Sequence, residues 1–168
     1  MLAGGLSSLA GQSHSGHRVW EFYDPTAEAE SLHRVEDAGS MEGDPAAVTK
    51  TAIERGLDQL GTLGGGNHFI ELQVVDRLPG KKYAERFGLF EGQLAIMVHS
   101  GSRGLGHEIG GHFMKLARQW REGQGGTGGE LAALPLDSKP GQDYLGAMRA
   151  AANYAFANRA LMAALAVG

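Results

Sequence analysis

The sequence predicts an α+β fold, in which a mixed or antiparallel sheet is covered by packed helices. Two apolar stretches with strand character, residues 68–75 and 93–98, alternate with segments of helical periodicity. With 168 residues the chain is long enough for one domain with a substantial core. Glycine occupies 27 positions, more than twice its usual share of about 7%. Many loops are therefore expected to adopt backbone angles that other residues avoid.

Composition limits the classes of function. The net charge of −4 argues against a broadly basic nucleic-acid surface, so any recognition of phosphate must be local. The sequence has no cysteine, which excludes a disulfide framework and thiolate metal ligands. It opens without a basic leader, and no apolar stretch reaches the ~20 residues needed to cross a bilayer. We therefore expect a cytoplasmic protein with no membrane partner.

Residues 1–34 are expected to form a poorly defined N-terminal segment, because residues 1–18 are rich in glycine and serine. His14 and His17 lie three positions apart there, a spacing that could ligate a metal on a helix. The neighbouring serine and glycine residues disfavour a helix, so solvated loop histidines are the better interpretation.

A helix is predicted to begin at Asp44 and to end at Gly56. Asp44 suits the N-cap, Pro45 suits the first helical position, and glycine commonly follows the last turn. After a glycine-rich loop, residues 68–75 alternate as a strand does, with His68 and Glu71 on opposite faces. A turn then leads to a short exposed helix over residues 81–87.

Residues 93–98 form an almost continuous apolar run, which predicts a strand that is buried on both faces. This strand leads through His99 into the glycine-rich loop of residues 100–104. Apolar residues then recur at helical spacing, so the loop is expected to lead into a helix N-terminus, which favours anions. These apolar positions are Leu105, Ile109, Phe113, Leu116 and Trp120. A flexible linker over 121–130 and a long alanine-rich helix over 142–167 complete the predicted elements.

The two predicted strands place two histidines at the same end if they pair in antiparallel fashion. His68 begins the first strand and His99 follows the second, and neighbouring strands lie only about 4.8 Å apart. Both imidazoles could then reach a common ion. Two unrelated loop histidines remain the alternative, because the connection between the strands is long for a hairpin. Most metal sites also need three or four protein ligands. Arg103 suits bidentate phosphate binding, although a surface ion pair would use the same side chain.

Four stretches of this sequence carry a resemblance to a known family: residues 41–48 (MEGDPAAV), 60–71 (LGTLGGGNHFIE), 98–107 (VHSGSRGLGH) and 150–159 (AAANYAFANR). Residues 60–71 and 98–107 are similar to two signatures of the RtcB-type RNA-splicing ligases, in the same order along the chain. The other two stretches resemble the flanking family stretches. The likeness runs from about Val35 to Arg159. It identifies residues 35–168 as the central, incomplete part of an RtcB-like catalytic domain.

The resemblance implies an RNA ligase that joins a 2′,3′-cyclic phosphate or 3′-phosphate end to a 5′-hydroxyl end, as in tRNA splicing and RNA repair. The family uses GTP and Mn²⁺, with two metal ions in the complete enzyme. Nitrogen and oxygen ligands are compatible with manganese. The implied partners are RNA, such as tRNA halves or broken RNA, together with GTP and an activating protein such as archease.

The resemblance also implies roles for individual residues. His68 and His99 would be metal ligands, one to each ion. Asn67 would contact a phosphate of GMP or of the RNA end, and Glu71 would lie by the guanosine site. The RNA phosphate would be held by Ser102 and Arg103. Residues for which we expect only a structural role are Asn153, Asn158 and Arg159.

The sequence departs from the family pattern in its nucleophile and in one bridging ligand. The family has an upstream aspartate and cysteine, a third ligand histidine and a guanylylated histidine, and this sequence has no counterpart of these last two and no cysteine. We therefore interpret it as an internal fragment that lacks a catalytic nucleophile and does not complete the reaction alone. Two alternatives remain open. One is a metal-dependent phosphoesterase, with Glu71 or His107 as a third ligand. The other is a non-catalytic RNA- or nucleotide-binding remnant.

Overall fold

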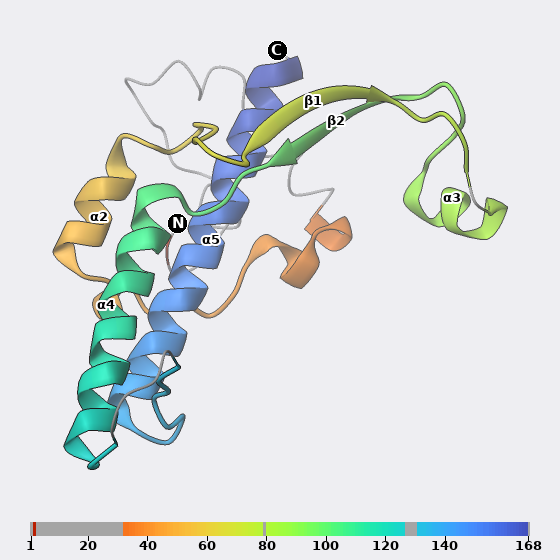
Figure 1. Cartoon of the computed structure of the whole chain (residues 1–168). Helices are drawn as coiled ribbons and strands as arrows, with labels where there is room; N and C mark the ends of the chain where they lie inside the picture. Colours follow the sequence, from red (N-terminus) through yellow and green to blue (C-terminus); the bar gives the residue numbers. More distant parts are fainter. Residues whose placement is uncertain (1, 3–31, 79, 127–130, 168) are drawn as a thin grey trace. The chain divides into compact units, whose positions relative to one another are not determined.

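The computed structural model describes residue 2 and residues 32–78, 80–126 and 131–167 (Figure 1). In this part of the chain there are four α-helices and one two-stranded antiparallel sheet, which confirms the predicted α+β class. His14 and His17 lie outside the described residues. The expected boundary after residue 34 stays a prediction.

The chain forms two compact units. One comprises Met1–Thr62 together with Gly101–Gly168, and the other is Leu63–Ser100. The second unit is therefore an insertion between two parts of the first. Each unit has its own physical character, and each is described below by itself.

The first unit is built on α4 (Arg103–Gly123), which packs against α2 (Lys50–Leu57) and α5 (Lys139–Val167) (Figure 1). Leu105, Ile109 and Phe113 are buried on α4, as their spacing predicted. Ala117 continues this buried stripe, whereas the Trp120 side chain stays 37% exposed. The apolar face therefore ends one turn earlier than the sequence indicated.

Small residues on α5 allow the chain to pass close to the helix backbone. The Asp44 N–H donates to the Gly146 carbonyl at 3.0 Å. A Cβ atom at Gly146 would lie 2.7 Å from the Asp44 Cβ, so no larger residue fits there without displacement. The core that results is rich in alanine: Val48, Ala52, Leu105, Ile109, Phe113, Ala147, Ala150, Ala151 and Tyr154.

The helix predicted from Asp44 to Gly56 is wrong as a single element. Asp44 does act as an N-cap, but it caps only the short 3-10 helix η5 (Pro45–Ala47). Thr49 then caps α2 separately by accepting from the Ala52 N–H at 3.2 Å. The residue between them, Val48, is extended and buried in the core, because its side chain must reach the apolar cluster. Two further 3-10 helices precede this region, η3 (Leu32–Arg34) and η4 (Glu36–Gly39).

Two predicted boundaries in the first unit also shift. The linker expected over 121–130 begins later, because α4 continues to Gly123. The C-terminal helix begins at Lys139 rather than at residue 142, with Pro140 in its first turn, a position where its missing N–H costs nothing.

The second unit is a β-hairpin whose connection contains a short helix. Strands β1 (Phe69–Val74) and β2 (Leu94–His99) pair in antiparallel fashion, from Phe69 opposite His99 to Val74 opposite Leu94. The helix α3 (Lys81–Phe87) has the predicted bounds and ends at Gly88, whose φ of +65° suits glycine.

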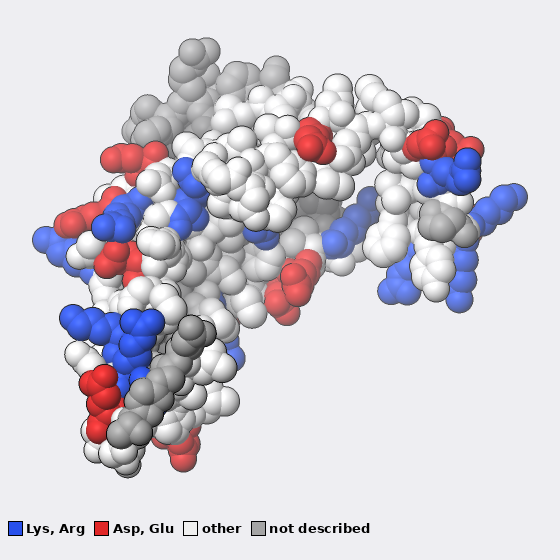
Figure 2. Space-filling view, in the orientation of Figure 1, with Lys and Arg blue, Asp and Glu red and all other residues white. Residues whose placement is uncertain are grey.

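The prediction that residues 93–98 are buried on both faces is wrong. Leu94 is 66% exposed and Met97 is 46% exposed, because the sheet formed by the described residues has two strands only and buries little surface. One face of the hairpin consists of three aliphatic cross-strand pairs: Ile70 with Val98, Leu72 with Ile96, and Val74 with Leu94. Accordingly, the hairpin surface in Figure 2 is largely uncharged.

Among the described residues, no helix is long and apolar enough to cross a membrane.

Tyr154 lies on α5, is 1% exposed, and donates a hydrogen bond to the Gly56 carbonyl at 2.7 Å. Burial raises the pKa of Tyr154 to about 12, and the Arg103 charge acts in the opposite direction. An unfolded tyrosine titrates near 10. Above that pH the unfolded chain releases a proton that the folded chain retains. The free energy of unfolding therefore falls as the pH rises from about 10 to about 12, and below this window Tyr154 adds no pH dependence.

We predict that Tyr154→Phe lowers the free energy of unfolding by about 1 kcal/mol at pH 7, because the buried Gly56 carbonyl loses its donor. The variant should also lose part of the alkaline fall in stability. Urea unfolding at several pH values between 7 and 11 measures both effects. Tyr83→Phe, at a residue that is 66% exposed on α3, is the control and should change neither. An alkaline fall that is equal in Tyr154→Phe and the wild type would contradict this assignment.

Candidate functional site

The hairpin brings His68 and His99 together at one end. The strands pair in antiparallel fashion, which is the condition under which the sequence placed the two histidines together. Phe69 lies opposite His99, so His68 directly precedes the last pair. The two imidazole centroids lie 6.0 Å apart, with the rings nearly perpendicular. A metal–imidazole bond is ~2.1 Å long, so a ring centroid lies roughly 3 Å from the ion that it ligates. The pair can therefore reach one ion or two adjacent ions.

One imidazole makes a hydrogen bond to a main-chain carbonyl. His68 Nδ1 lies 2.6 Å from the Gly65 carbonyl oxygen. A carbonyl only accepts hydrogen bonds, so Nδ1 carries the proton and Nε2 keeps its lone pair. Ligand histidines in metalloproteins commonly make this kind of bond to a carbonyl. His99 is exposed and contacts the Phe69 ring, with centroids 5.2 Å apart.

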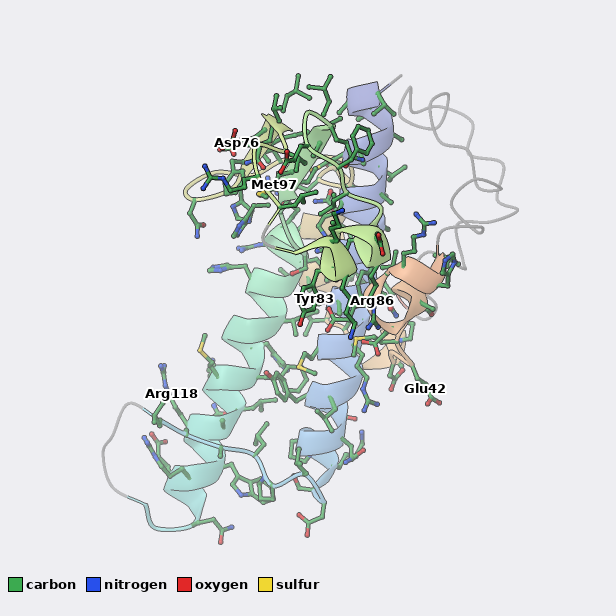
Figure 3. All side chains as sticks on the ribbon, turned by 90° about the vertical axis from the view of Figure 1, so that its right-hand side faces the viewer. Glu42, Asp76, Tyr83, Arg86, Met97 and Arg118 are labelled. Carbon is green, nitrogen blue, oxygen red and sulfur yellow. The ribbon has the colours of Figure 1, made fainter. Side chains whose placement is uncertain are left out.

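Glu71 lies on the same face of the hairpin as His99, because His99 pairs with Phe69 and Met97 pairs with Glu71. Its carboxylate accepts a hydrogen bond from Gln73 Nε2 at 2.8 Å. Gln73 Nε2 also lies 3.8 Å from the sulfur of Met97, which is labelled in Figure 3. This face therefore carries a carboxylate, an amide and an imidazole, whereas the opposite face is aliphatic. Asn67 precedes the strand and is exposed.

The second group of predicted residues opens α4 in the other unit. Ser102 is the N-cap residue, but its side chain makes no capping hydrogen bond. Arg103 has a φ of +53°, an unusual value for a residue with a side chain. Its Nε donates to Thr62 Oγ1 at 3.1 Å, so the terminal guanidinium nitrogens are the atoms that a phosphate would engage.

Main-chain contacts hold this helix start in place. The Gly104 N–H donates to Gln59 Oε1 at 2.8 Å, and Thr62 Oγ1 donates to the Gln59 carbonyl at 2.5 Å. A Cβ atom at Gly106 would overlap Ser102 Oγ, so glycine is required there. The glycines of this motif thus allow close approach. Because the Gly104 N–H is already bonded to Gln59, the predicted anion site at this helix N-terminus stays a prediction.

A groove of about 350 Å³ between α4 and α5 begins beside Ser102. Apart from Ser102 and the Tyr144 hydroxyl, its lining is apolar or glycine: Gly101, Gly106, Ile109, Gly110, Met148, Ala151, Ala152 and Ala155. It holds no carboxylate, imidazole or basic group and therefore offers no acid–base chemistry of its own.

The described residues contain no group of three or more His, Asp or Glu side chains that could hold a metal ion. The structure thus brings together the two predicted nitrogen donors, His68 and His99, and adds no third. His107 and His112 are both exposed on α4. Asn67, His68, Glu71 and His99 lie in one unit, and Ser102 and Arg103 lie in the other.

Three residues that support the site were not predicted from the sequence. Thr62 and Gln59 orient Arg103 and Gly104, and Asn158 contacts the main chain on both sides of the insertion. Asn158 was expected to be structural only, because the resemblance assigned it no role. Its one signal in the sequence is an amide within an alanine-rich helical stretch.

On the face shown in Figure 2, side chains of both charges are interspersed over α2 and α4. Arg55 on α2 pairs with Glu108 on α4, with Nη1 and Oε2 3.1 Å apart. This pattern agrees with the expectation that phosphate recognition is confined to a small number of groups.

Comparison with known proteins gives a consistent result. Residues 8–168 match the family described as tRNA-splicing ligase RtcB. A tRNA-splicing ligase RtcB of Thermococcus kodakarensis is 46% identical over 134 residues, which cover 78% of this chain and 28% of the relative. The protein of the same name from Pyrococcus furiosus is 47% identical over 134 residues, 78% of this chain and 14% of the relative. The chain thus spans 28% or less of the length of these curated relatives.

We predict that the isolated chain binds Mn²⁺ weakly and that His68→Ala or His99→Ala reduces the affinity at least about tenfold, because each removes one of two ligands. Paramagnetic broadening of the imidazole NMR signals during a Mn²⁺ titration measures this. His107→Ala is the control, since this histidine is exposed on α4. Equal broadening of all the histidine signals, unchanged in the two variants, would contradict a site at the hairpin.

Proposed function

The chain belongs to the tRNA-splicing ligase RtcB family, and on this premise we propose that it supplies two metal ligands and a phosphate contact to an RNA-joining site. The joined ends would be a 2′,3′-cyclic phosphate or 3′-phosphate and a 5′-hydroxyl, with GTP and Mn²⁺ as cofactors. The observation that carries this proposal is the pairing of His68 with His99 at the end of a hairpin, with centroids 6.0 Å apart. RNA, GTP, an activating protein of the archease type and a cytoplasmic location belong to the same proposal.

The residues present fit part of a metal site. The Nε2 atom of His68 is available, because its Nδ1 is bonded to Gly65, and His99 supplies a second nitrogen donor. Mn²⁺ accepts such nitrogen ligands together with oxygen ligands. When bound, metal ions neutralise phosphate charge and hold the reacting oxygens in line. Two protein ligands do not complete a site, and the described residues show no preformed group of three, so the proposed site needs ligands besides this pair.

The protein's own groups would act on the RNA and the nucleotide as follows. Arg103, whose Nε is occupied by Thr62, would present its terminal nitrogens to the RNA phosphate. Ser102, whose hydroxyl does not cap α4, would donate to the same phosphate. Glu71 would accept from a guanosine donor, and Asn67 would contact a phosphate of GMP or of the RNA end. None of these steps supplies a nucleophile.

Of the two other functions, binding without turnover is the one that an observation favours. A phosphoesterase would need a third ligand, and no group of three ligand side chains occurs in the described part of the chain. A module that binds the RNA 3′-phosphate through Arg103 and the helix N-terminus needs no third ligand.

We predict that the chain alone does not join RNA, because it has no cysteine to bridge two metal ions and no counterpart of the guanylylated histidine. Incubation with GTP, Mn²⁺ and RNA carrying 3′-phosphate and 5′-hydroxyl ends should give no ligated product on a denaturing gel. Joined RNA at a rate proportional to the concentration of the chain would refute this expectation.

A chimera tests whether the same residues support RNA joining within a complete ligase. The matched 134 residues of the Thermococcus kodakarensis relative would be replaced by the matching segment of this chain. We expect the chimera to join RNA, and His68→Ala in it to abolish joining. The Tyr83→Phe chimera is the matched control. A His68→Ala chimera that is as active as its parent would exclude the proposed role of this histidine.

We predict that Arg103→Ala weakens binding of a short 3′-phosphorylated RNA about tenfold or more, because a charge-assisted hydrogen bond of about 1.5–3 kcal/mol is lost. Fluorescence anisotropy with labelled RNA measures the Kd. Arg118, an exposed arginine on the same helix that is labelled in Figure 3, gives the control Arg118→Ala. An RNA with a 3′-hydroxyl end should be insensitive to Arg103→Ala. Equal losses from both substitutions would indicate only non-specific attraction.

A further inference from the structure

Asn158 on α5 is fully buried, and its side-chain amide is bonded to two main-chain segments that are far apart in sequence. Its Oδ1 accepts from the N–H groups of Gly61 and Thr62 at 2.7 and 3.1 Å. Its Nδ2 donates to the carbonyls of Thr62 and Gly101 at 3.1 and 3.2 Å. The acceptor and both donors of the amide are thus used on the backbone.

These main-chain segments are the two points at which the chain leaves and re-enters the first unit. Thr62 immediately precedes the inserted unit Leu63–Ser100, and Gly101 immediately follows it. Within the inserted unit, Ser100 Oγ donates to the Leu63 carbonyl at 2.7 Å, and Ser100 is only 8% exposed. The entry and the exit of the hairpin are therefore joined by two ties: the Asn158 hydrogen bonds in the first unit and the Ser100–Leu63 hydrogen bond in the inserted unit.

The tie lies close to the histidine pair along the chain. His99 is two residues before Gly101, and His68 is six residues after Thr62. At its other end the hairpin closes through a long connection that contains α3, which does not restrict the register as a tight turn would. A slip by one residue would turn the His99 side chain to the opposite face and shift the exit by ~3.3 Å relative to the entry.

We propose that Asn158 is a positioning residue for the histidine pair: by holding Thr62 and Gly101 together, it fixes the register that places His68 beside His99. The functional consequence of this register rests on the proposed metal role of the two histidines. The control of register by Asn158 itself does not depend on metal.

The substitution that tests this proposal is Asn158→Asp, which keeps the size and the acceptor oxygen. The new carboxylate can still accept from Gly61 and Thr62, but it cannot donate to Gly101. The hydrogen bond to the Gly101 carbonyl is then lost, whereas the two bonds accepted from the Gly61 and Thr62 N–H groups remain.

The structure offers a matched control on the same helix. Asn153 is also fully buried, accepts from the Met41 N–H at 2.8 Å and donates to the Met41 carbonyl at 2.8 Å. Asn153→Asp therefore removes the same kind of hydrogen bond at a place that does not flank the hairpin.

Two measurements on the full chain separate positioning from mere stability. The first is the nuclear Overhauser effect between the ring protons of His68 and His99, together with amide exchange in β1 and β2. The second is the Mn²⁺ affinity from paramagnetic broadening. We expect Asn158→Asp to weaken the ring contact, speed exchange in both strands and lower the Mn²⁺ affinity at least about tenfold. Asn153→Asp should lower the melting temperature comparably and leave all three unchanged.

The proposal is overturned if Asn158→Asp keeps the ring contact and the strand protection of the wild type. If that variant does not fold, Ser100→Ala is the second test, because it removes the hydrogen bond from Ser100 Oγ to the Leu63 carbonyl and should change the same signals in the same direction. Unchanged signals in Ser100→Ala would then count against it. A wild type that shows the ring contact but binds no Mn²⁺ would refute the proposed metal role of the histidines. The nuclear Overhauser effect and the amide exchange would still test whether Asn158 fixes the register.

Discussion

Two buried amides on α5 impose the constraint on which the rest of the described fold depends. Asn153 and Asn158 are both fully buried, and an unpaired polar group in such a place would cost several kcal/mol. Each is satisfied by main chain from a distant part of the sequence, Asn153 by Met41 and Asn158 by Gly61, Thr62 and Gly101. The alanine and glycine neighbours on α5 make this possible, because they let other backbone segments come close. The helix thus orders loops that have little regular structure of their own.

The hairpin is stabilised by interactions other than buried apolar contacts. Two strands alone bury little surface, and its aliphatic face stays exposed, with Leu72 71% and Val74 61% accessible. What defines it is its ladder of backbone hydrogen bonds and the ties at its base. The two histidines proposed as metal ligands lie at that base, beside the hydrogen bonds that join the entry and the exit of the hairpin.

The candidate site combines two kinds of phosphate chemistry that remain separate within this chain. In the proposed function, the hairpin supplies imidazole nitrogens for metal ions, and the start of α4 supplies the Arg103 guanidinium for an anion. That function also needs further metal ligands and a nucleophile. The chain spans 28% or less of the length of its relatives, and its glycines, its strained Arg103 and its buried amides fix the local shape of the groups that it carries.

The sequence alone was sufficient for the α+β class, the two strands, α3 and α4, because alternation, helical spacing and glycine positions are local signals. It also predicted that His68 and His99 would meet if the two strands paired in antiparallel fashion, and the structure shows that pairing. It did not predict the break at Val48, the exposure of Leu94 or the main-chain hydrogen bonds of Asn158. Each of these depends on residues that are distant in sequence. Val48 packs into a core built from several helices, and Leu94 is exposed because the described sheet has two strands only. Asn158 bonds to backbone groups 57 to 97 positions away, which need partners because they are partly buried. Periodicity describes one element at a time, and only the tertiary structure decides which buried polar groups find each other.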